Sequence, residues 1–405
     1  MARTWDMDSD SLDMQPFVFR LKLAVQQELF PHIEAIIGPL SEKEKKFAMV
    51  AELLPLDNLM QCYRWSGFGR PPHLRTRMLL AFIAKAVWNI PTTKDMIDRL
   101  KGDSRLRRLC AWPDTDKLPS ESSFSRAFAT FAADALPTKV HEALVSVGLS
   151  EKLVGHISRD STAIEARETP AKRINKRASR RSRGANSDCT ITRAVRATMK
   201  AGIKASRKGS RGQAKSTSRR PTPKEEKRLT LQAGRTLEEN LQDLPTQCDV
   251  GVKRNSEGYT NRWIGYKLHI DTADGDIPVS AILTSASLHD SQVAIPLMQK
   301  TSQLLDYLYD LGDSAFDAKA IREYSRKLGH VPIIDVNKRR GSAVGFDPAE
   351  QTRYQERVGS ERVNSNLKDN YGGRFVRVRG PAKVLAHLMM GIIAMTGIHI
   401  LRMLE

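Results

Sequence analysis

The sequence is short of the residues that stabilise small secreted or zinc-stapled proteins. Among its 405 residues are only four cysteines, Cys62, Cys110, Cys189 and Cys248, and no two of them form a Cys-x-x-Cys pair. This spacing disfavours a disulfide scaffold, a zinc knuckle and a thioredoxin-like motif, and it fits a reducing cytosol. The residues before Phe17 include four aspartates and lack the basic start and apolar stretch of a secretion signal. We therefore expect a cytoplasmic protein.

Long apolar runs are also scarce, as expected for an ordinary globular chain with 40% apolar and 27% charged residues. The exception is residues 384–404, which are long enough for one membrane span. His387, His399 and Arg402 interrupt this run, and no second span accompanies it. We predict a helix that covers a sheet face and no membrane partner. The chain length corresponds to about two or three domains of roughly 150 residues each.

Acidic residues are scarce in one particular stretch. Between Arg167 and Arg235, 22 Lys and Arg accompany four Asp and Glu, so this stretch carries +18 of the formal net charge of +19. Such a segment favours a polyanion, usually nucleic acid. It contains no Trp, Phe or Tyr, which disfavours an interfacial membrane helix. Its Lys, Arg, Ser, Thr and Gly content predicts flexibility in the absence of a partner, with a helix over 190–203 forming on DNA.

Residues 1–148 show helical periodicity and are predicted to form an all-α N-terminal domain. Ser41 and Glu44 have capping-box spacing, and Thr92 or Thr93 is placed to cap a later helix. A helix that opens near Pro119 completes the pattern and would follow a tight turn. Short helices joined in this way could form a DNA-binding helix-turn-helix, with contacts from Ser122, Ser123, Ser125 or Arg126. The alternative is a helical domain packed around its aromatic residues.

Residues 149–405 alternate strand and helix signals. Strands are predicted over 153–160, 262–271, 277–285, 307–311 and 331–336, and helices over 288–305 and 317–328. An Asp-Gly pair at 274–275 is typical of a hairpin turn. This order predicts a mixed α/β sheet with flanking helices, because parallel strands need crossover connections. We expect the basic segment to interrupt this domain as a flexible insert at about 167–247.

Three carboxylates occupy positions suited to metal chemistry. Asp160 and Asp313 each end a predicted strand, and Glu361 lies in a predicted helix that follows Pro348. Strand ends project side chains into the functional crevice of an α/β sheet, and carboxylate oxygens are ligands that Mg²⁺ prefers. Asp and Glu are also common as caps and surface residues, and sequence spacing does not show whether the three converge. Nearby alternatives are Asp290, Asp310 and Asp317.

The predicted helix around Glu361 carries further polar groups on the same face. Tyr354, Arg357, Glu361 and Lys368 fall within an arc of about 60° on one helix face, at ~100° per residue. A guanidinium and an ammonium beside a metal-binding carboxylate suit a phosphate backbone. An exposed helix with ordinary ion pairs, such as Arg357 with Glu361, would explain the charges equally well.

Together these motifs resemble DDE transposases of bacterial insertion sequences. The residues from Tyr354 to Lys368 match the Tyr-(2)-Arg-(3)-Glu-(6)-Lys signature of one group of this family. The stretch that begins Asp160-Ser-Thr-Ala is similar to the segment around the first catalytic Asp, and Gly312-Asp313-Ser-Ala to the segment around the second. The helical stretch over about 65–136 is similar to the amino-terminal domain of the group.

The resemblance implies an RNase H-like catalytic core with two divalent ions, Mg²⁺ or Mn²⁺. It implies that Asp160, Asp313 and Glu361 are catalytic metal ligands and that Tyr354, Arg357 and Lys368 bind DNA. It further implies cleavage by water, strand transfer by a 3′ hydroxyl, and a homodimer or higher assembly on the double-stranded DNA of element ends and target, within the nucleoid. A metal-dependent nuclease without joining activity and a noncatalytic DNA-binding relic of a transposase are the alternatives.

Overall fold

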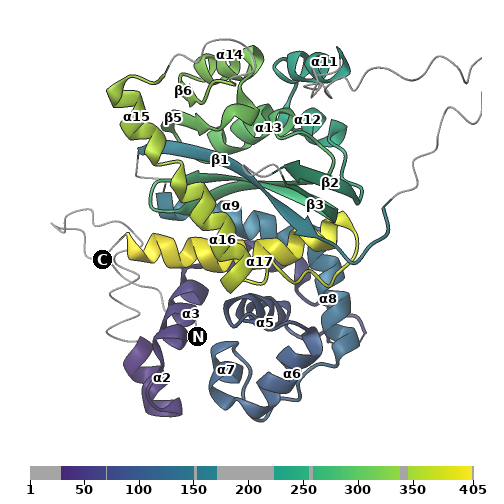
Figure 1. Ribbon diagram of the computed structural model, residues 1–405. Coiled ribbons are helices and arrows are strands. Elements are labelled where there is room, and N and C mark those ends of the chain that lie inside the picture. Colours follow the sequence, from purple (N-terminus) through teal and green to yellow (C-terminus); the bar gives the residue numbers. More distant parts are fainter. Residues whose placement is uncertain are drawn as a thin grey trace, which may run out of the picture. The chain divides into compact units, whose positions relative to one another are not determined.

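The N-terminal third of the chain is helical in a computed structural model, which describes residues 29–69, 71–149, 153–170, 223–254, 259–337 and 345–403 (Figure 1). The described residues up to Pro170 and from Pro223 onwards group into one unit. Most of the basic segment, including the predicted helix over 190–203, lies outside the described residues.

The helical region holds short helices with the caps that the sequence predicts. Its elements are α2 (Phe30–Ile37), α3 (Glu42–Leu53), α4 (Leu56–Leu59), η2 (Gln61–Tyr63), α5 (Arg75–Val87), α6 (Thr93–Gly102), α7 (Ser104–Leu109), α8 (Glu121–Ala133) and α9 (Leu136–Leu149). The capping box of Ser41 and Glu44 is present, and the Thr92 hydroxyl caps α6 by accepting from the Asp95 N–H. These caps satisfy backbone N–H groups that a helix leaves unpaired at its start.

The connection before α8 is longer than that of a helix-turn-helix. Eleven residues, 110–120, separate α7 from α8, whereas the motif joins its two helices by about three or four residues. Ser122, Ser125 and Arg126 are nevertheless exposed on the first turns of α8. DNA contact by this helix therefore stays a prediction, without the tight turn that the sequence suggested.

The second part of the chain builds a mixed sheet. Its strands are β1 (Val154–Glu165), β2 (Asp249–Arg254), β3 (Thr260–Ala273), β4 (Ile277–Ser285), β5 (Tyr307–Gly312) and β6 (Val331–Ile334). β3 pairs antiparallel with β1, β2 and β4, whereas β1, β5 and β6 run parallel to one another. β2 and β4 share the same edge of β3, since β2 pairs with residues 260–265 and β4 with residues 266–273. The predicted mixed sheet is confirmed.

Helices cover both faces of the sheet (Figure 1). One face packs against α13 (Ser291–Ser302) and α14 (Lys319–Lys327), flanked by α11 (Pro223–Gln232) and α12 (Leu237–Asp243). The other face packs against α16 (Val358–Asn370) and α17 (Pro381–Arg402), which follow α15 (Pro348–Gln355). The alternation along β4 explains this division, because Ala281 and Leu283 meet α17 while Ile282 meets α13.

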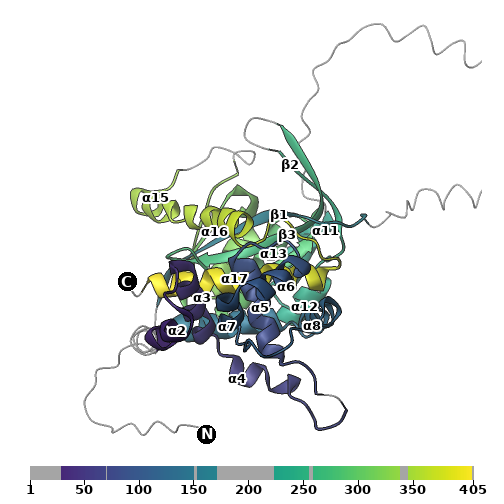
Figure 2. The ribbon, with the colours of Figure 1, turned by 90° about the horizontal axis from the view of Figure 1, so that it is seen from below.

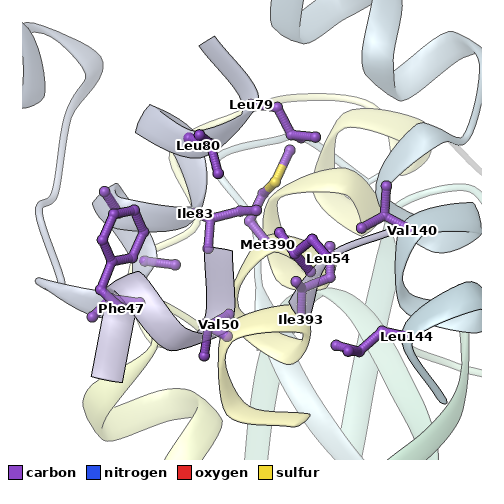
Figure 3. Close-up of a cluster of buried hydrophobic side chains, with 14 of the residues drawn as sticks. Phe47, Val50, Leu54, Leu79, Leu80, Ile83, Val140, Leu144, Met390 and Ile393 are labelled. Atoms are coloured by element: carbon purple, nitrogen blue, oxygen red, sulfur yellow. The ribbon is translucent and has the colours of Figure 1, made fainter. Parts of the chain in front are cut away.

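The apolar run near the C-terminus is the central helix of the fold. Among the described residues, α17 is the one helix long and apolar enough to cross a membrane, and 89% of its most apolar stretch is buried. Figure 3 shows Met390 and Ile393 of α17 packed among side chains of α3, α5 and α9, and Figure 2 shows the helical region lying against α17. Gly391 permits close packing, because a Cβ there would lie 2.5 Å from the Tyr371 carbonyl oxygen.

The end of the predicted flexible insert is folded. Residues 223–232 form α11 and residues 237–243 form α12, and both helices contact α13. Leu229 and Gln232 are buried, and the Gln232 amide donates to the Gln292 carbonyl over 2.9 Å. The prediction of flexibility is therefore wrong for residues 223–247, because apolar residues spaced along α11 and α12 find partners on α13.

Candidate active site

Asp160 and Asp313 lie side by side on neighbouring parallel strands. Arg159 of β1 pairs with Gly312 of β5, so the next residue of each strand is one of these two aspartates. Asp313 also caps the short helix η3 (Ser314–Phe316), where its Oδ1 accepts from the Ala315 N–H over 2.9 Å. The topology of β1 and β5 thus brings together two carboxylates that are 153 residues apart in the sequence.

Burial and neighbouring charges act on Asp160 in opposite directions. Burial raises the pKa of the Asp160 carboxyl, and the negative charge of Asp313 raises it further. The backbone N–H of Ser161 and the cations Lys253 and Arg357 oppose this shift. A buried carboxylate that lies beside a second carboxylate and is also acted on by nearby cations is typical of a functional site rather than of a structural ion pair.

Glu361 lies near this pair but is turned to another partner. It occupies the first turn of α16, and its Oε1 accepts from Arg357 Nη1 over 3.2 Å and from Nη2 over 3.1 Å. Its side chain is 58% exposed. Among the described residues, no three His, Cys, Asp or Glu side chains are grouped closely enough to hold a metal ion. The structure therefore brings two of the three predicted ligands together and places the third against Arg357.

The predicted stripe of Tyr354, Arg357, Glu361 and Lys368 lies on two helices rather than one. α15 ends at Gln355 and α16 begins at Val358, so the expected continuous helix is wrong at this point. The Arg357 carbonyl accepts from the Ser360 hydroxyl over 2.9 Å and from the Ser158 hydroxyl of β1 over 3.3 Å. Side-chain hydroxyls at a backbone carbonyl are a known cause of helix breaks.

Members of the stripe still contact one another across this break. The Arg357 guanidinium lies 5.9 Å from the centre of the Tyr354 ring and pairs with Glu361. Burial works against its positive charge, yet Tyr354, Asp313 and Glu361 together raise the pKa of Arg357. Lys368 lies in the last turn of α16, where burial, Arg374 and Lys253 lower its pKa. Lys368 thus belongs to a second group of cations near the other end of α16.

The alternative aspartates are engaged in internal contacts. Asp310 is fully buried and accepts from Ser325 over 2.6 Å and from Arg159 over 3.2 Å. Asp290 pairs with Lys267 over 3.0 Å. Asp317 pairs with Arg322 over 3.1 Å and accepts from the Asn337 N–H. Each of the three aspartates therefore has partners within the fold.

Comparison with protein families identifies the chain. A model described as a transposase DDE domain matches residues 247–396, and a second transposase domain, DUF772, matches residues 37–130. The chain belongs to the DDE transposases. The two matches together cover more than half of the chain and confirm its resemblance to insertion-sequence transposases. They do not show whether the chain belongs to the group with the Tyr-Arg-Glu-Lys signature. Searches of curated proteins and of solved structures gave no match.

Two polar residues near Asp160 were not predicted from the sequence. Asn364 of α16 donates from Nδ2 to Asp160 Oδ2 over 3.0 Å. It follows Glu361 by three residues and thus shares its helix face, a signal that was available in the sequence. Lys253 of β2 lowers the pKa of Asp160 through its charge. No spacing signal could have found it, because β2 reaches the site only through its pairing with β3.

Proposed function

We propose that this transposase binds the ends of its element, cleaves DNA strands there with divalent metal ions, and joins the freed 3′ ends to target DNA. The adjacency of Asp160 and Asp313 carries the proposal, within a chain of the DDE family. The mixed sheet with helices on both faces supports an RNase H-like core. We further propose that the protein acts as a homodimer or higher assembly on DNA in the nucleoid.

The chemistry of the carboxylate pair fits a hard divalent cation. Mg²⁺ usually takes one or two protein carboxylates and completes its coordination with water and substrate phosphate. Asp160 and Asp313 would supply the first two ligands, and Glu361 would join them after leaving Arg357. The bound ions would lower the barrier for attack and departure of the phosphodiester oxygens. The protein itself holds the carboxylates in place and binds the DNA backbone.

Tyr354, Arg357 and Lys368 would bind the phosphates next to the cleaved bond. Arg357 is well placed, since it touches Glu361 and is electrostatically coupled to Asp160 and Asp313. A phosphate that takes over the guanidinium would also release Glu361 toward the other two carboxylates. DNA and metal binding would then reinforce each other at one site.

The double variant Arg357→Ala, Lys368→Ala tests this role. Each lost charge-assisted contact to phosphate costs about 1.5–3 kcal/mol, so loss of both contacts should weaken formation of the complex with element ends by about 100-fold or more. Binding is measured by fluorescence anisotropy on an end duplex, after circular dichroism has confirmed folding. Lys319→Ala, Arg326→Ala on α14 removes the same charge from the opposite face and serves as the control. Equal binding by the two double variants would show that Arg357 and Lys368 do not contribute to DNA binding.

A joining assay separates the proposed function from that of a nuclease. A duplex with the element end and a labelled 3′ strand is incubated with supercoiled plasmid, the protein and Mg²⁺. A transposase produces cleaved end and labelled plasmid, whereas a nuclease produces only the cleaved end. Binding with neither product, under conditions that support metal binding, would favour a noncatalytic relic.

The basic segment should supply much of the sequence-independent DNA affinity. Residues 171–222 include 17 Lys and Arg and one Asp. Each neutralised phosphate adds about 0.9 to the slope of log affinity against log salt on duplex DNA. Replacing residues 171–222 by a Gly/Ser linker of the same length should therefore flatten this slope by several units and weaken binding to all sequences alike. An unchanged slope would show that the segment does not contact the DNA backbone.

A further inference from the structure

Asn364 makes a single side-chain hydrogen bond in the described part of the chain, and its partner is Asp160. The Nδ2–H group donates to Asp160 Oδ2 over 3.0 Å. The residue is 7% exposed, and its Oδ1 is buried without a hydrogen-bond partner among the described residues. A buried acceptor without a partner costs stability, which is unusual unless the residue serves another purpose.

The surroundings of Asn364 hold the amide in one place. Val363 and Leu367, its neighbours on α16, are fully buried in the core shared with β1, β3 and α17. A helix anchored on both sides of a buried residue leaves that side chain little freedom to turn away. The orientation of the amide is also determined, because its opposite orientation would place the carbonyl oxygen against the Asp160 carboxylate.

The helix that carries Asn364 also carries Glu361. Asn364 and Glu361 are three residues apart, so one turn of α16 presents an amide to Asp160 and a carboxylate to Arg357. The Ser158 hydroxyl of β1 binds the Arg357 carbonyl just before α16, which ties the start of the helix to the strand that carries Asp160. α16 is therefore fixed to β1 by a contact on each side of Glu361.

We propose that Asn364 is a positioning residue that holds the Asp160 carboxylate in the orientation in which it takes a divalent cation together with Asp313. This inference rests on the proposed function of the carboxylate pair. A donor on one oxygen fixes the rotation of the carboxylate and so reduces the cost of ordering it when the cation binds. Loss of such hydrogen bonds to metal ligands typically costs 10- to 100-fold in metal affinity or activity.

The test uses Asn364→Leu, which keeps the approximate shape of the side chain and removes its donor, with Asn364→Ala as a second variant. Mn²⁺ binding to the full-length protein on an end duplex is measured by electron paramagnetic resonance of the free ion. We expect the Mn²⁺ dissociation constant to rise by about 10- to 100-fold in both variants. Affinity for the duplex in EDTA should stay within twofold of wild type, and cleavage should recover as Mn²⁺ is raised.

Asn366→Leu is the matched control. Asn366 lies on the same helix, accepts from Asn370 Nδ2 over 2.8 Å and makes no hydrogen bond to a carboxylate among the described residues. A purely structural role for Asn364 would change unfolding but not the Mn²⁺ dissociation constant. Wild-type Mn²⁺ affinity in both Asn364 variants would overturn the inference.

Asp160→Ala separates failure of this inference from failure of the proposed function. If Asp160→Ala loses Mn²⁺ binding while the Asn364 variants keep it, the metal site stands and the positioning role is wrong. If Asp160→Ala binds Mn²⁺ and cleaves as the wild type does, the proposed site is wrong and the positioning role fails with it.

Discussion

Replacing Asp160 or Asp313 by alanine should reduce strand cleavage at the element ends by about 1,000-fold or more, since metal ions supply several kcal/mol of transition-state stabilisation. Both carboxylates lie where the neighbouring strands β1 and β5 bring them side by side. DNA binding should persist, because the phosphate contacts are assigned to cations. Cleavage is measured on an end-labelled duplex in Mg²⁺, and binding by anisotropy in EDTA.

Glu361→Ala is expected to give the same loss, although Glu361 contacts Arg357 in the structure. This loss is expected because Glu361 is proposed to leave its ion pair and join the two aspartates during the reaction. Glu323→Ala, which removes an exposed carboxylate from α14, is the control and should cleave as the wild type does. Full cleavage by Glu361→Ala would reject the triad and leave Asp160 and Asp313 as the only assigned ligands.

Arg159→Met should lower the free energy of unfolding by about 3–5 kcal/mol, because removing one partner of a buried ion pair leaves an uncompensated charge. Arg159 points to the opposite side of β1 from Asp160, where Nη2 donates to Asp271 Oδ2 over 2.8 Å and to Asp310 Oδ1 over 3.2 Å. All three side chains are at most 3% exposed. The loss is measured by urea unfolding followed by circular dichroism.

A comparison of buried and exposed arginines makes this prediction specific. Arg362 pairs with Asp276 over 2.7 Å near the surface, and Arg362→Met should cost no more than about 1 kcal/mol. Adding Asp271→Asn and Asp310→Asn to Arg159→Met should restore part of the lost stability, because the two buried charges are then removed. Equal destabilisation by Arg159→Met and Arg362→Met would show that the buried cluster contributes no more than a surface pair.

Local sequence was sufficient to predict many of the helices and strands. Alternating apolar residues and the Asp-Gly turn predicted β3 and β4, and the capping residues predicted α3 and α6. Asp160 and Asp313 could be singled out because each was predicted to end a strand. This is confirmed for Asp313, which directly follows β5, but wrong for Asp160, because pairing with β3 continues β1 to Glu165. Because His387, His399 and Arg402 interrupt its apolar run, α17 was predicted to cover a sheet face, and 89% of its most apolar stretch is buried in the fold.

The break between α15 and α16 could not be predicted from the local sequence. The spacing from Tyr354 to Lys368 fits one helix, and only the Ser360 hydroxyl, which binds the Arg357 carbonyl, acts against it from within that stretch. The Ser158 hydroxyl, about 200 residues away in the sequence, binds the Arg357 carbonyl where the helix would continue. The folding of α11 and α12 has a similar origin, because their apolar residues are too few to predict a core and become buried only against α13.

The family, the mixed α/β class, the helical N-terminal region and the candidate carboxylates could all be predicted from the sequence, because periodicity and motif spacing are local properties. Which carboxylates meet depends on the folded chain. The tertiary structure placed Asp313 beside Asp160, directed Glu361 to Arg357, joined Asn364 to Asp160 and buried Arg159 between Asp271 and Asp310. Each of these contacts depends on strand register and helix packing between segments far apart in the chain, and no spacing within one segment encodes them.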